Sequence, residues 1–482
     1  MTMKILYVTS EAAPFAKTGG LGDVAGALPA AISGKEDEVR VIMPLYASVS
    51  DDWRSQMRFV KQLYIPLAWR NLYCGLFELK TGGGTVYFVD NEYYFKRGDI
   101  HGHYDDGERF GFFSRAVAAL LTELDGWVPE VVHCNDWHTA LVPVYMRHTY
   151  GGVAAVDAMK TVFTIHNVEY QGRFARDTLE NVFGLPHTLF DGGTLEFMGG
   201  INLMKGAIEM SDRVTTVSPT YAQELKEAFY AHGLDGVISA NEAKLSGILN
   251  GIDTKLYNPE KDECLTKNYS LKNLAGKAVC KAELQKILGL AQNPSVPLIV
   301  SVGRLVSHKG IDLIADGLDE MMDIRGEIQF ALLGRGDWHF EQTLSAIQHR
   351  FEGRVSVSIT YNAALSNAFY AGGDIFLMPS QSEPCGLSQM IAMRYGTVPV
   401  VRETGGLRDT VEPYNPDTGE GLGFTFANYD KYDMLFAVRR AVDLYYSDKE
   451  RWGAIQKRGM SRNFTWADSA KAYKALYQGL FA

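Results

Sequence analysis

The stretch Lys17-Thr18-Gly19-Gly20-Leu21-Gly22-Asp23-Val24 guides the interpretation of the whole chain, because it nearly recurs as Thr404-Gly405-Gly406-Leu407-Arg408-Asp409-Thr410-Val411. Each copy follows a short apolar run, residues 4–9 and 398–401, and precedes a segment compatible with a helix. Paired glycines at a strand-to-helix junction let backbone N–H groups approach an anion, and the helix N-terminus adds partial positive charge. A tight turn without a ligand is the alternative for either copy. The repetition favours two lobes that each bind a phosphate-bearing ligand.

Composition narrows the class of protein. The 482 residues suggest two to four domains, and a hydrophobic content of 46% is sufficient for ordinary globular cores. A formal charge of −10 argues against nucleic acid or an acidic membrane as partner. The sequence contains neither a membrane-spanning run nor a signal peptide, and its five scattered cysteines form no Cys-x-x-Cys pair. These features predict a cytoplasmic protein, or one in a similarly reducing compartment such as the plastid stroma.

Two series of short apolar runs alternate with amphipathic segments, which is typical of doubly wound parallel sheets. The first series predicts strands at residues 5–9, 39–43, 85–89, 131–134, 160–165 and 213–217. The second predicts strands at residues 298–302, 328–333, 355–359, 374–378, 398–401 and 422–426. Between them, residues 250–294 have a looser pattern and are interpreted as a hinge, and the amphipathic end of the chain is interpreted as a helix.

Cationic and acidic side chains follow strands of the second series. Arg304 and Lys309 lie in a strand-to-helix loop, where a guanidinium fork and a mobile ammonium suit a diphosphate, although either could be a solvated surface charge. Glu383 precedes a proline and a predicted helix start, and its alternative role is to interact with the helix dipole. Cys385 has no histidine partner nearby in the sequence and is interpreted as a small packed thiol.

Polar and aromatic side chains follow strands of the first series. Asp136-Trp137-His138 and His166-Asn167 lie at neighbouring strand ends, where ligands of such sheets collect. An indole beside polar groups suits stacking on a sugar. A zinc site is the competing interpretation, but the ligand spacing is not a standard one. The chain also lacks an Asp-x-Asp clamp, a P-loop and a Gly-x-Gly-x-x-Gly fingerprint, which disfavours NTPases and dehydrogenases.

Taken together, these motifs resemble those of bacterial glycogen synthases and plant-type starch synthases, nearly from end to end. The resemblance is carried by residues 17–24, 136–138, 166–167, 170–172, 217–221, 249–253, 304–310, 332–337, 383–387, 404–410 and 464–466. It implies two Rossmann-like α/β domains facing across a deep cleft (GT-B type), with a C-terminal helix that crosses back to the first domain. The expected boundaries are residues 1–250, 251–460 and 461–482.

The resemblance further implies a retaining glycosyltransferase that moves glucose from ADP-glucose to the non-reducing end of an α-1,4-glucan, without a metal or other cofactor. As catalytic residues it implies Glu383, His166, Asp136, Arg304 and Lys309. The donor would be bound by Lys17, Gly19, Gly20, Asp23, Asn250, Tyr361, Cys385, Gly386, Leu387, Thr404, Gly405 and Gly406. Tyr361 would stack on adenine, and Trp137 and His138 would meet the acceptor. Same-face attack is favoured over double displacement, because no enzymic nucleophile stands out.

Some positions depart from the family pattern, notably Gln381 and His308, where Arg and Gln are familiar. Three alternatives remain open: a two-lobe transferase with another acceptor, a nucleotide-sugar epimerase, and a catalytically weak paralogue that binds glucan. Intact Lys17, Arg304, Lys309 and Glu383 favour an enzyme over a pure binder. The sequence leaves open the oligomeric state, the choice between glycogen and starch as product, and the choice between ADP- and UDP-glucose.

Overall fold

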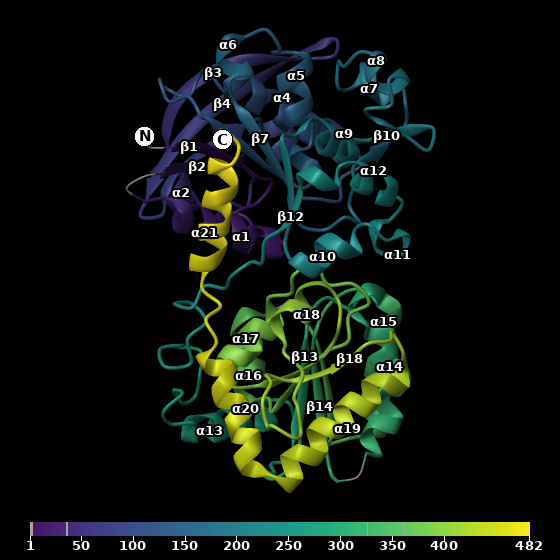
Figure 1. Cartoon of the computed structure of the whole chain (residues 1–482). Helices are drawn as coiled ribbons and strands as arrows, with labels where there is room; N and C mark the ends of the chain where they lie inside the picture. The colour runs from purple at the N-terminus through teal and green to yellow at the C-terminus, as the bar shows by residue number, and fades with distance from the viewer. Residues whose placement is uncertain (1–2, 35–36, 325, 361) are drawn as a thin grey trace. The chain divides into compact units, whose positions relative to one another are not determined.

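A computed structural model describes residues 3–34, 37–324, 326–360 and 362–482 (Figure 1). The chain divides into two compact units, Met1–Gly251 with Trp466–Ala482, and Ile252–Thr465. The divisions therefore fall after Gly251 and Thr465, where the sequence had suggested 250 and 460. Among the described residues, no helix is both long and apolar enough to span a membrane.

A nine-stranded sheet, in the order β12-β11-β7-β6-β1-β2-β5-β4-β3, forms the centre of the first unit. Its strands are β1 (Met3–Val8), β2 (Asp37–Pro44), β3 (Arg58–Leu67), β4 (Arg70–Thr81), β5 (Gly84–Asp90), β6 (Val131–Asn135), β7 (Lys160–Ile165), β11 (Arg213–Thr216) and β12 (Leu245–Gly247). A small sheet contains β8 (Arg173–Phe174), β9 (Glu196–Phe197) and β10 (Gly200–Asn202). All six strands predicted for this half are present, and they pair in parallel.

The sheet of the first unit is parallel, as predicted, except at one edge, where β3 and β4 form an antiparallel hairpin that continues onto β5 and that the sequence did not predict. Much of β3 is exposed or half-buried. An exposed edge strand lacks the continuous apolar run by which the buried parallel strands were found.

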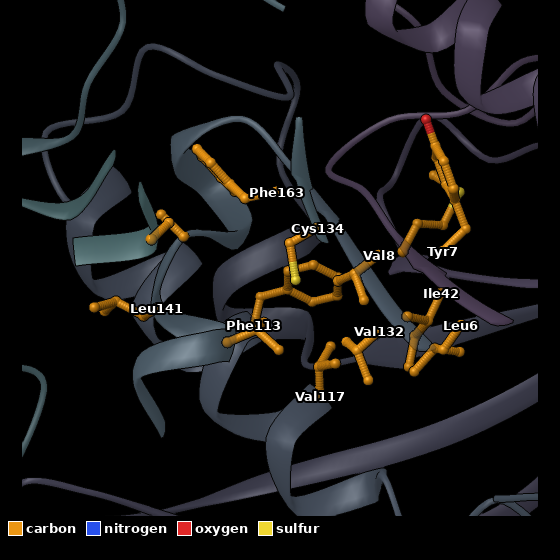
Figure 2. Packing of buried hydrophobic residues seen from close by; sticks show 14 of the residues in the cluster. Leu6, Tyr7, Val8, Ile42, Phe113, Val117, Val132, Cys134, Leu141 and Phe163 are labelled. Carbon is orange, nitrogen blue, oxygen red and sulfur yellow. The ribbon is translucent and has the colours of Figure 1, made fainter. Parts of the chain in front are cut away.

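The first unit also contains helices. They are α1 (Gly20–Ile32), α2 (Asp51–Arg54), α3 (Glu92–Phe95), α4 (Asp106–Leu120), α5 (Leu141–His148), α6 (Ala154–Asp157), α7 (Thr178–Asn181), α8 (Thr188–Asp191), α9 (Leu203–Met210), α10 (Pro219–Glu224), α11 (Ala228–Ala231), α12 (Asp235–Ala240) and α21 (Trp466–Gln478), with 3-10 turns η1 (Trp137–Thr139) and η2 (Glu242–Lys244). Figure 2 shows part of the core, where Phe113 and Val117 of α4 lie beside Val132 and Cys134 of β6. The central strands are buried on both faces, as expected for a covered parallel sheet.

The last helix, α21, belongs to the first unit, as the fold class expected from the resemblance requires. It packs against α1, and both helices are labelled in Figure 1. The Tyr477 hydroxyl lies 2.7 Å from Nδ1 of His133 in β6, and Lys474 Nζ lies 3.0 Å from a carboxylate oxygen of Asp37. The end of the chain is therefore fixed to the sheet by one buried hydrogen bond and one partly exposed ion pair as well as by apolar packing.

The second unit has a six-stranded parallel sheet in the order β15-β14-β13-β16-β17-β18. Its strands are β13 (Leu298–Val302), β14 (Gln329–Gly334), β15 (Val355–Ile359), β16 (Ile375–Met378), β17 (Val398–Arg402) and β18 (Phe424–Phe426). Its helices are α13 (Ala275–Ile287), α14 (Ile311–Met322), α15 (Trp338–Arg350), α16 (Ala363–Gly372), α17 (Ser388–Arg394), α18 (Gly405–Thr410), α19 (Lys431–Ser447) and α20 (Lys449–Ser461), with the 3-10 turn η3 (Ser307–Lys309). The sequence predicted all six strands.

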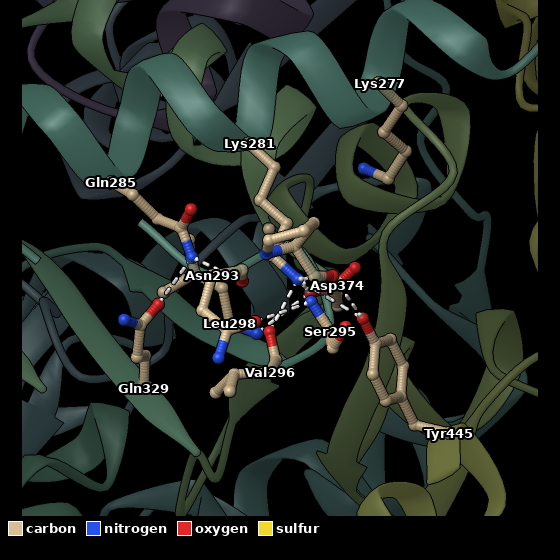
Figure 3. A network of polar contacts seen from close by, with 12 residues as sticks. Lys277, Lys281, Gln285, Asn293, Ser295, Val296, Leu298, Gln329, Asp374 and Tyr445 are labelled. Carbon is tan, nitrogen blue, oxygen red and sulfur yellow. Dashed lines mark hydrogen bonds and ion pairs between the residues drawn. The ribbon is translucent and has the colours of Figure 1, made fainter. Parts of the chain in front are cut away.

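Helix α13 lies within residues 250–294, the segment interpreted as a hinge, and the sequence did not predict this helix. The buried face of α13 carries Lys277, Lys281 and Gln285, spaced four residues apart, beside Cys280 and Leu284, so polar residues interrupt its apolar stripe (Figure 3). Lys281 Nζ lies 2.7 Å from a carboxylate oxygen of Asp374, and Gln285 donates to Oε1 of Gln329 at 2.7 Å. A face of buried, hydrogen-bonded amines and amides does not appear as a hydrophobic stripe in a sequence.

Candidate active site

In the first unit, polar residues gather after three neighbouring strands, β1, β6 and β7, whose carboxyl ends share one edge of the sheet. Glu11 follows β1, Asp136 follows β6, and His166 follows β7 directly. Asp136 and His166 are in direct contact, since the His166 N–H donates to Oδ1 of Asp136 at 2.7 Å. The sequence had predicted this pair from the ends of the two strands.

The first glycine loop connects β1 to α1. Lys17 Nζ lies 2.6 Å from Oδ1 of Asp23, so two predicted donor-binding residues form an ion pair. The sequence did not single out Glu11, whose carboxylate contacts this loop. The carboxylate accepts hydrogen bonds from the Thr18 N–H, from the Thr18 hydroxyl at 3.0 Å and from the Gly19 N–H. Burial raises the pKa of Glu11. A carboxylate thus occupies an amide cradle of the kind that binds anions.

Asp136 has an unusual backbone conformation, with φ of 56° and ψ of 176°. Non-glycine residues rarely adopt positive φ, and such strain tends to occur at functional sites. The carboxylate accepts from the N–H groups of His166 and Asn167, at 2.7 and 3.4 Å. Burial nevertheless raises its pKa to about 7. Such a carboxyl group changes its protonation state close to neutral pH.

The His166 side chain is held by a residue that the sequence analysis did not identify. Its Nε2 lies 2.9 Å from Oδ1 of Asn135, and the Tyr7 hydroxyl donates to the same oxygen at 2.9 Å. Burial lowers the pKa of His166 to about 3, so the ring is neutral at pH 7. Asn135 is the last residue of a strand predicted to end one residue earlier, which is why it was not recognised as part of the site.

Trp137 and His138, the predicted acceptor residues, belong to an aromatic cluster. The His138 ring stacks on His101 at 4.5 Å between centroids and meets Phe110 edge-on at 4.6 Å. Burial lowers the pKa of His138 well below its ordinary value. Trp137 is half-buried, whereas His138 is buried, so the indole is the more accessible of the two to a ligand.

In the second unit, a small pocket of about 70 Å³ opens at the carboxyl ends of β13 and β16. Arg304 and Lys309 both line it, with backbone and side chains of Ser301, Val302, Gly303, Leu305, Ile311, Leu332, Met378, Ser380 and Ser388. Arg304 is exposed and Lys309 is half-buried. The structure thus places the two predicted cations on one concave surface.

Glu383 is the carboxylate of this pocket region. It is 5% exposed, and its Oε2 lies 2.6 Å from Lys309 Nζ and accepts from the Ser380 hydroxyl at 3.2 Å. The structure therefore brings Glu383, Lys309 and Arg304 together. Ser380, the residue that orients the carboxylate, was not predicted.

The second glycine loop, at the N-terminus of α18, packs against the backbone beside Glu383. A Cβ at Gly405 would lie 2.0 Å from the Glu383 carbonyl oxygen, and one at Gly406 would lie 2.0 Å from that of Cys385. The Gly406 N–H donates to the carbonyls of Glu383 and Pro384, at 3.1 and 3.2 Å. These glycines permit close contact between two loops, so the N–H of Gly406 is not directed at a ligand.

The other predicted donor residues are distributed between the units. Thr404 and Cys385 are buried, and Leu387 is half-buried. Gly386, two residues before α17, has a φ of 71°. Asn250 is 6% exposed in the first unit, and its Oδ1 has no hydrogen-bond partner among the described residues. Tyr361 lies outside the described residues.

Gln389, another residue that the sequence did not reveal, links the backbone of residues 385–386 to the end of α18. It is fully buried, and its Nε2 donates to the carbonyls of Cys385 and Gly386 and to the Thr410 hydroxyl, at 3.1, 2.9 and 3.0 Å. Glutamine is common on helix surfaces, so nothing in the sequence distinguishes a buried one.

As for metals, no group of three His, Cys, Asp or Glu in the described part of the chain could hold an ion.

Comparison with known proteins identifies the family. Residues 4–240 match the family model described as starch synthase catalytic domain, and residues 285–458 match glycosyl transferases group 1. The chain is 47% identical over 478 residues to a glycogen synthase of Geobacillus thermodenitrificans, covering 99% of this chain and 98% of that protein. The chain belongs to the glycogen synthase family. A glycogen synthase of Clostridioides difficile is 44% identical over 482 residues, covering 99% of this chain and 100% of the relative.

Solved structures agree with this family assignment. The catalytic domain of starch synthase IV from Arabidopsis thaliana, bound to ADP and acarbose, superposes with a TM-score of 0.92 at 35% identity, covering 100% of this chain and 99% of that one. Sucrose-phosphate synthase from Thermosynechococcus elongatus, at 18% identity and a TM-score of 0.61 over 99% of both chains, shares the fold. This member of the glycogen synthase family is a glycosyltransferase with the GT-B fold.

Proposed function

We propose that this glycogen synthase relative transfers glucose from ADP-glucose to the non-reducing end of an α-1,4-glucan, with retention of configuration. The observation that carries the proposal is the pocket of the second unit, where Arg304 and Lys309 lie on one concave surface and Glu383 contacts Lys309. The starch synthase that matches this chain over its full length was solved with ADP and acarbose bound.

The chemistry of the residues supports this assignment. When the bond between the anomeric carbon and a diphosphate breaks, negative charge grows on the phosphate while the sugar becomes cation-like. Arg304 and Lys309 would stabilise the departing diphosphate, and this leaves no step that requires a metal ion. Glu383 would accept a hydrogen bond from the glucose. In the first unit, Asp136 and His166 would hold the glucose, and Trp137 would stack on the glucan acceptor.

Retention would follow from same-face attack, with the leaving phosphate accepting the proton of the acceptor hydroxyl. Glu383 is engaged by Lys309 and Ser380, and Asp136 by two backbone N–H groups, which makes both poor candidates for an attacking nucleophile. A glycosyl–enzyme adduct isolated on either carboxylate by mass spectrometry would contradict this mechanism.

The decisive experiment measures transfer of labelled glucose to glycogen, with ADP-glucose and UDP-glucose compared in the presence of EDTA. We expect transfer from ADP-glucose in EDTA and at least a hundredfold loss in Lys309→Ala and Glu383→Ala. Arg335→Ala is the matched control, because Arg335 follows the neighbouring strand β14 without lining the pocket. Loss of transfer in EDTA would refute the metal-free chemistry, and transfer from UDP-glucose alone would refute the donor assignment.

A catalytically weak paralogue that binds glucan is the second candidate function, and the Lys309–Glu383 contact argues against it, since a pure binder needs no diphosphate site. ADP should raise the melting temperature of the enzyme, because any ligand that binds the native state stabilises it. The proposed compartment is the cytoplasm, since none of the five cysteines, all of which the structure describes, forms a disulfide bond.

A further inference from the structure

Asn135 is a fully buried amide whose orientation is fixed by its neighbours. Its Nδ2 donates to the Val8 carbonyl at 2.9 Å and lies 3.4 Å from the His133 carbonyl. Carbonyl oxygens only accept hydrogen bonds, so the amide nitrogen must face these two groups and Oδ1 must face the other way. A flipped amide would place its oxygen against two carbonyls.

On its other side, Oδ1 of Asn135 accepts from two side chains, the Tyr7 hydroxyl and the His166 ring, each at 2.9 Å. Tyr7 is a fully buried member of the apolar core, and its hydroxyl points away from the labelled apolar side chains (Figure 2). All four hydrogen-bonding positions of the amide are therefore occupied, two as donors and two as acceptors. An amide so completely engaged cannot rotate without losing hydrogen bonds in a buried environment.

This geometry determines where His166 carries its proton. Because Oδ1 of Asn135 can only accept, Nε2 of His166 must carry the hydrogen. The ring is neutral at pH 7, so its second nitrogen, Nδ1, carries a lone pair. No described residue donates to Nδ1, and His166 is only half-buried, so this nitrogen remains available to accept a hydrogen bond from a ligand.

We propose that Asn135, oriented by Tyr7 and by the Val8 carbonyl, is a positioning residue that fixes His166 as a hydrogen-bond acceptor and thereby selects a substrate hydroxyl at that place. The inference rests on the proposed function for the identity of the hydroxyl, which would be one of the glucosyl unit. The site would accept a sugar hydroxyl and reject groups that cannot donate, such as fluorine or a phosphate oxygen.

The proton position can be read without turnover. Nitrogen-15 NMR of the histidine-labelled protein, with His166→Gln to assign its signals among the eleven histidines, distinguishes Nε2–H from Nδ1–H. We expect Nε2–H in the wild type and in Tyr7→Phe, and a mixture of tautomers in Asn135→Leu. In Asn135→Asp the carboxylate should stabilise the charged ring and raise the pKa of His166 by at least one unit. A wild-type ring protonated at Nδ1, or an unchanged titration in Asn135→Asp, would overturn the proposal.

Asn241→Asp is the matched control. Asn241 is also a buried amide of the first unit, but its Nδ2 donates to the Val237 carbonyl and it does not contact His166. The same chemical change there should leave the His166 signals in place. If they move as much as in Asn135→Asp, the effect is general and the proposal fails.

Activity supplies the second readout, with ADP-glucose analogues in which each glucose hydroxyl is replaced singly by fluorine. At one position, the wild type should lose at least tenfold in kcat/KM, and Asn135→Leu should show a smaller loss at that position. If no position behaves in this way, the proposed selection of a hydroxyl is refuted. A wild type that shows Nε2–H but transfers no glucose from natural donors would contradict the proposed function and leave the role of Asn135 in orienting His166 intact.

Discussion

Replacing Glu383 by glutamine should strengthen the binding of ADP while it removes transfer. In the unliganded protein, Lys309 Nζ lies 2.6 Å from the Glu383 carboxylate, so much of its charge is compensated within the site. Arg304, Lys309 and Glu383 together carry one net positive charge, and Glu383→Gln raises it to two. Two unit charges about 4 Å apart interact by about 1 kcal/mol in water and about 4 kcal/mol near a protein surface. Because Lys309 keeps 22% of its side chain exposed, we expect a gain of about 2 kcal/mol, roughly thirtyfold in Kd.

Isothermal titration with ADP, at low and at high ionic strength, measures this gain, which salt should reduce. Glu403→Gln is the matched control, because Glu403 follows β17 and accepts from the Thr425 hydroxyl without contacting Lys309. It changes the net charge equally and should leave the affinity within about twofold. If Glu383→Gln binds ADP no more tightly than Glu403→Gln, the ammonium of Lys309 does not contact the nucleotide and its assignment to the diphosphate is wrong.

Three further predictions follow from burial and packing. The pKa of Asp136 is about 7 in the folded protein, whereas the unfolded chain releases this proton near pH 4. The free energy of unfolding should therefore fall by about 1.4 kcal/mol for each unit of pH increase between pH 4 and 7. Urea titrations should show that Asp136→Asn removes this slope. Burial lowers the pKa of Lys277 to about 7, so above that pH the unfolded chain holds a proton that the folded protein has lost. The free energy of unfolding should therefore rise with pH from about 7 to 10. In the same titrations, Lys277→Met should abolish that rise. Gly406→Ala places a Cβ 2.0 Å from the Cys385 carbonyl oxygen and should lower the free energy of unfolding by about 3 kcal/mol, whereas the Cβ of Gly19→Ala meets nothing closer than 4.0 Å. Equal melting temperatures for the two variants would contradict this packing.

Strands buried on both faces could be predicted from the sequence, because continuous apolar runs have few alternative structures. The hairpin of β3 and β4 and the helix α13 could not be predicted in this way, for opposite reasons. The hairpin lies at an exposed edge and lacks a continuous apolar run, whereas α13 buries lysines that hydrogen bonds and an ion pair compensate. The spacing of apolar residues in a sequence indicates which face is buried only where that face is apolar.

The candidate site was predicted to a similar extent. Charged residues at strand ends, such as Arg304, Lys309 and Glu383, could be found because parallel sheets bring their carboxyl ends to one edge. The residues that contact the site from behind could not: Ser380 contacts Glu383, Asn135 contacts His166, and Gln389 contacts the backbone of residues 385–386. Their types are common everywhere in proteins, and only the fold shows which of them contact a functional side chain.

The two glycine loops show how far sequence repetition can be extended to function. Both read Thr-Gly-Gly-Leu, and a common role as phosphate cradles was the simplest expectation. In the first loop a Cβ at Gly19 has no close neighbour, and the loop amides hold the carboxylate of Glu11. In the second, Gly405 and Gly406 are required because the backbone of residues 383–385 lies against them. The first loop thus retains the chemistry of an anion site, with a carboxylate that an incoming phosphate would have to displace, whereas the second fixes the backbone from which Glu383 projects. The same four residues therefore hold a carboxylate with their amides in one unit and permit a close backbone contact in the other, and the neighbouring chain determines which arrangement forms.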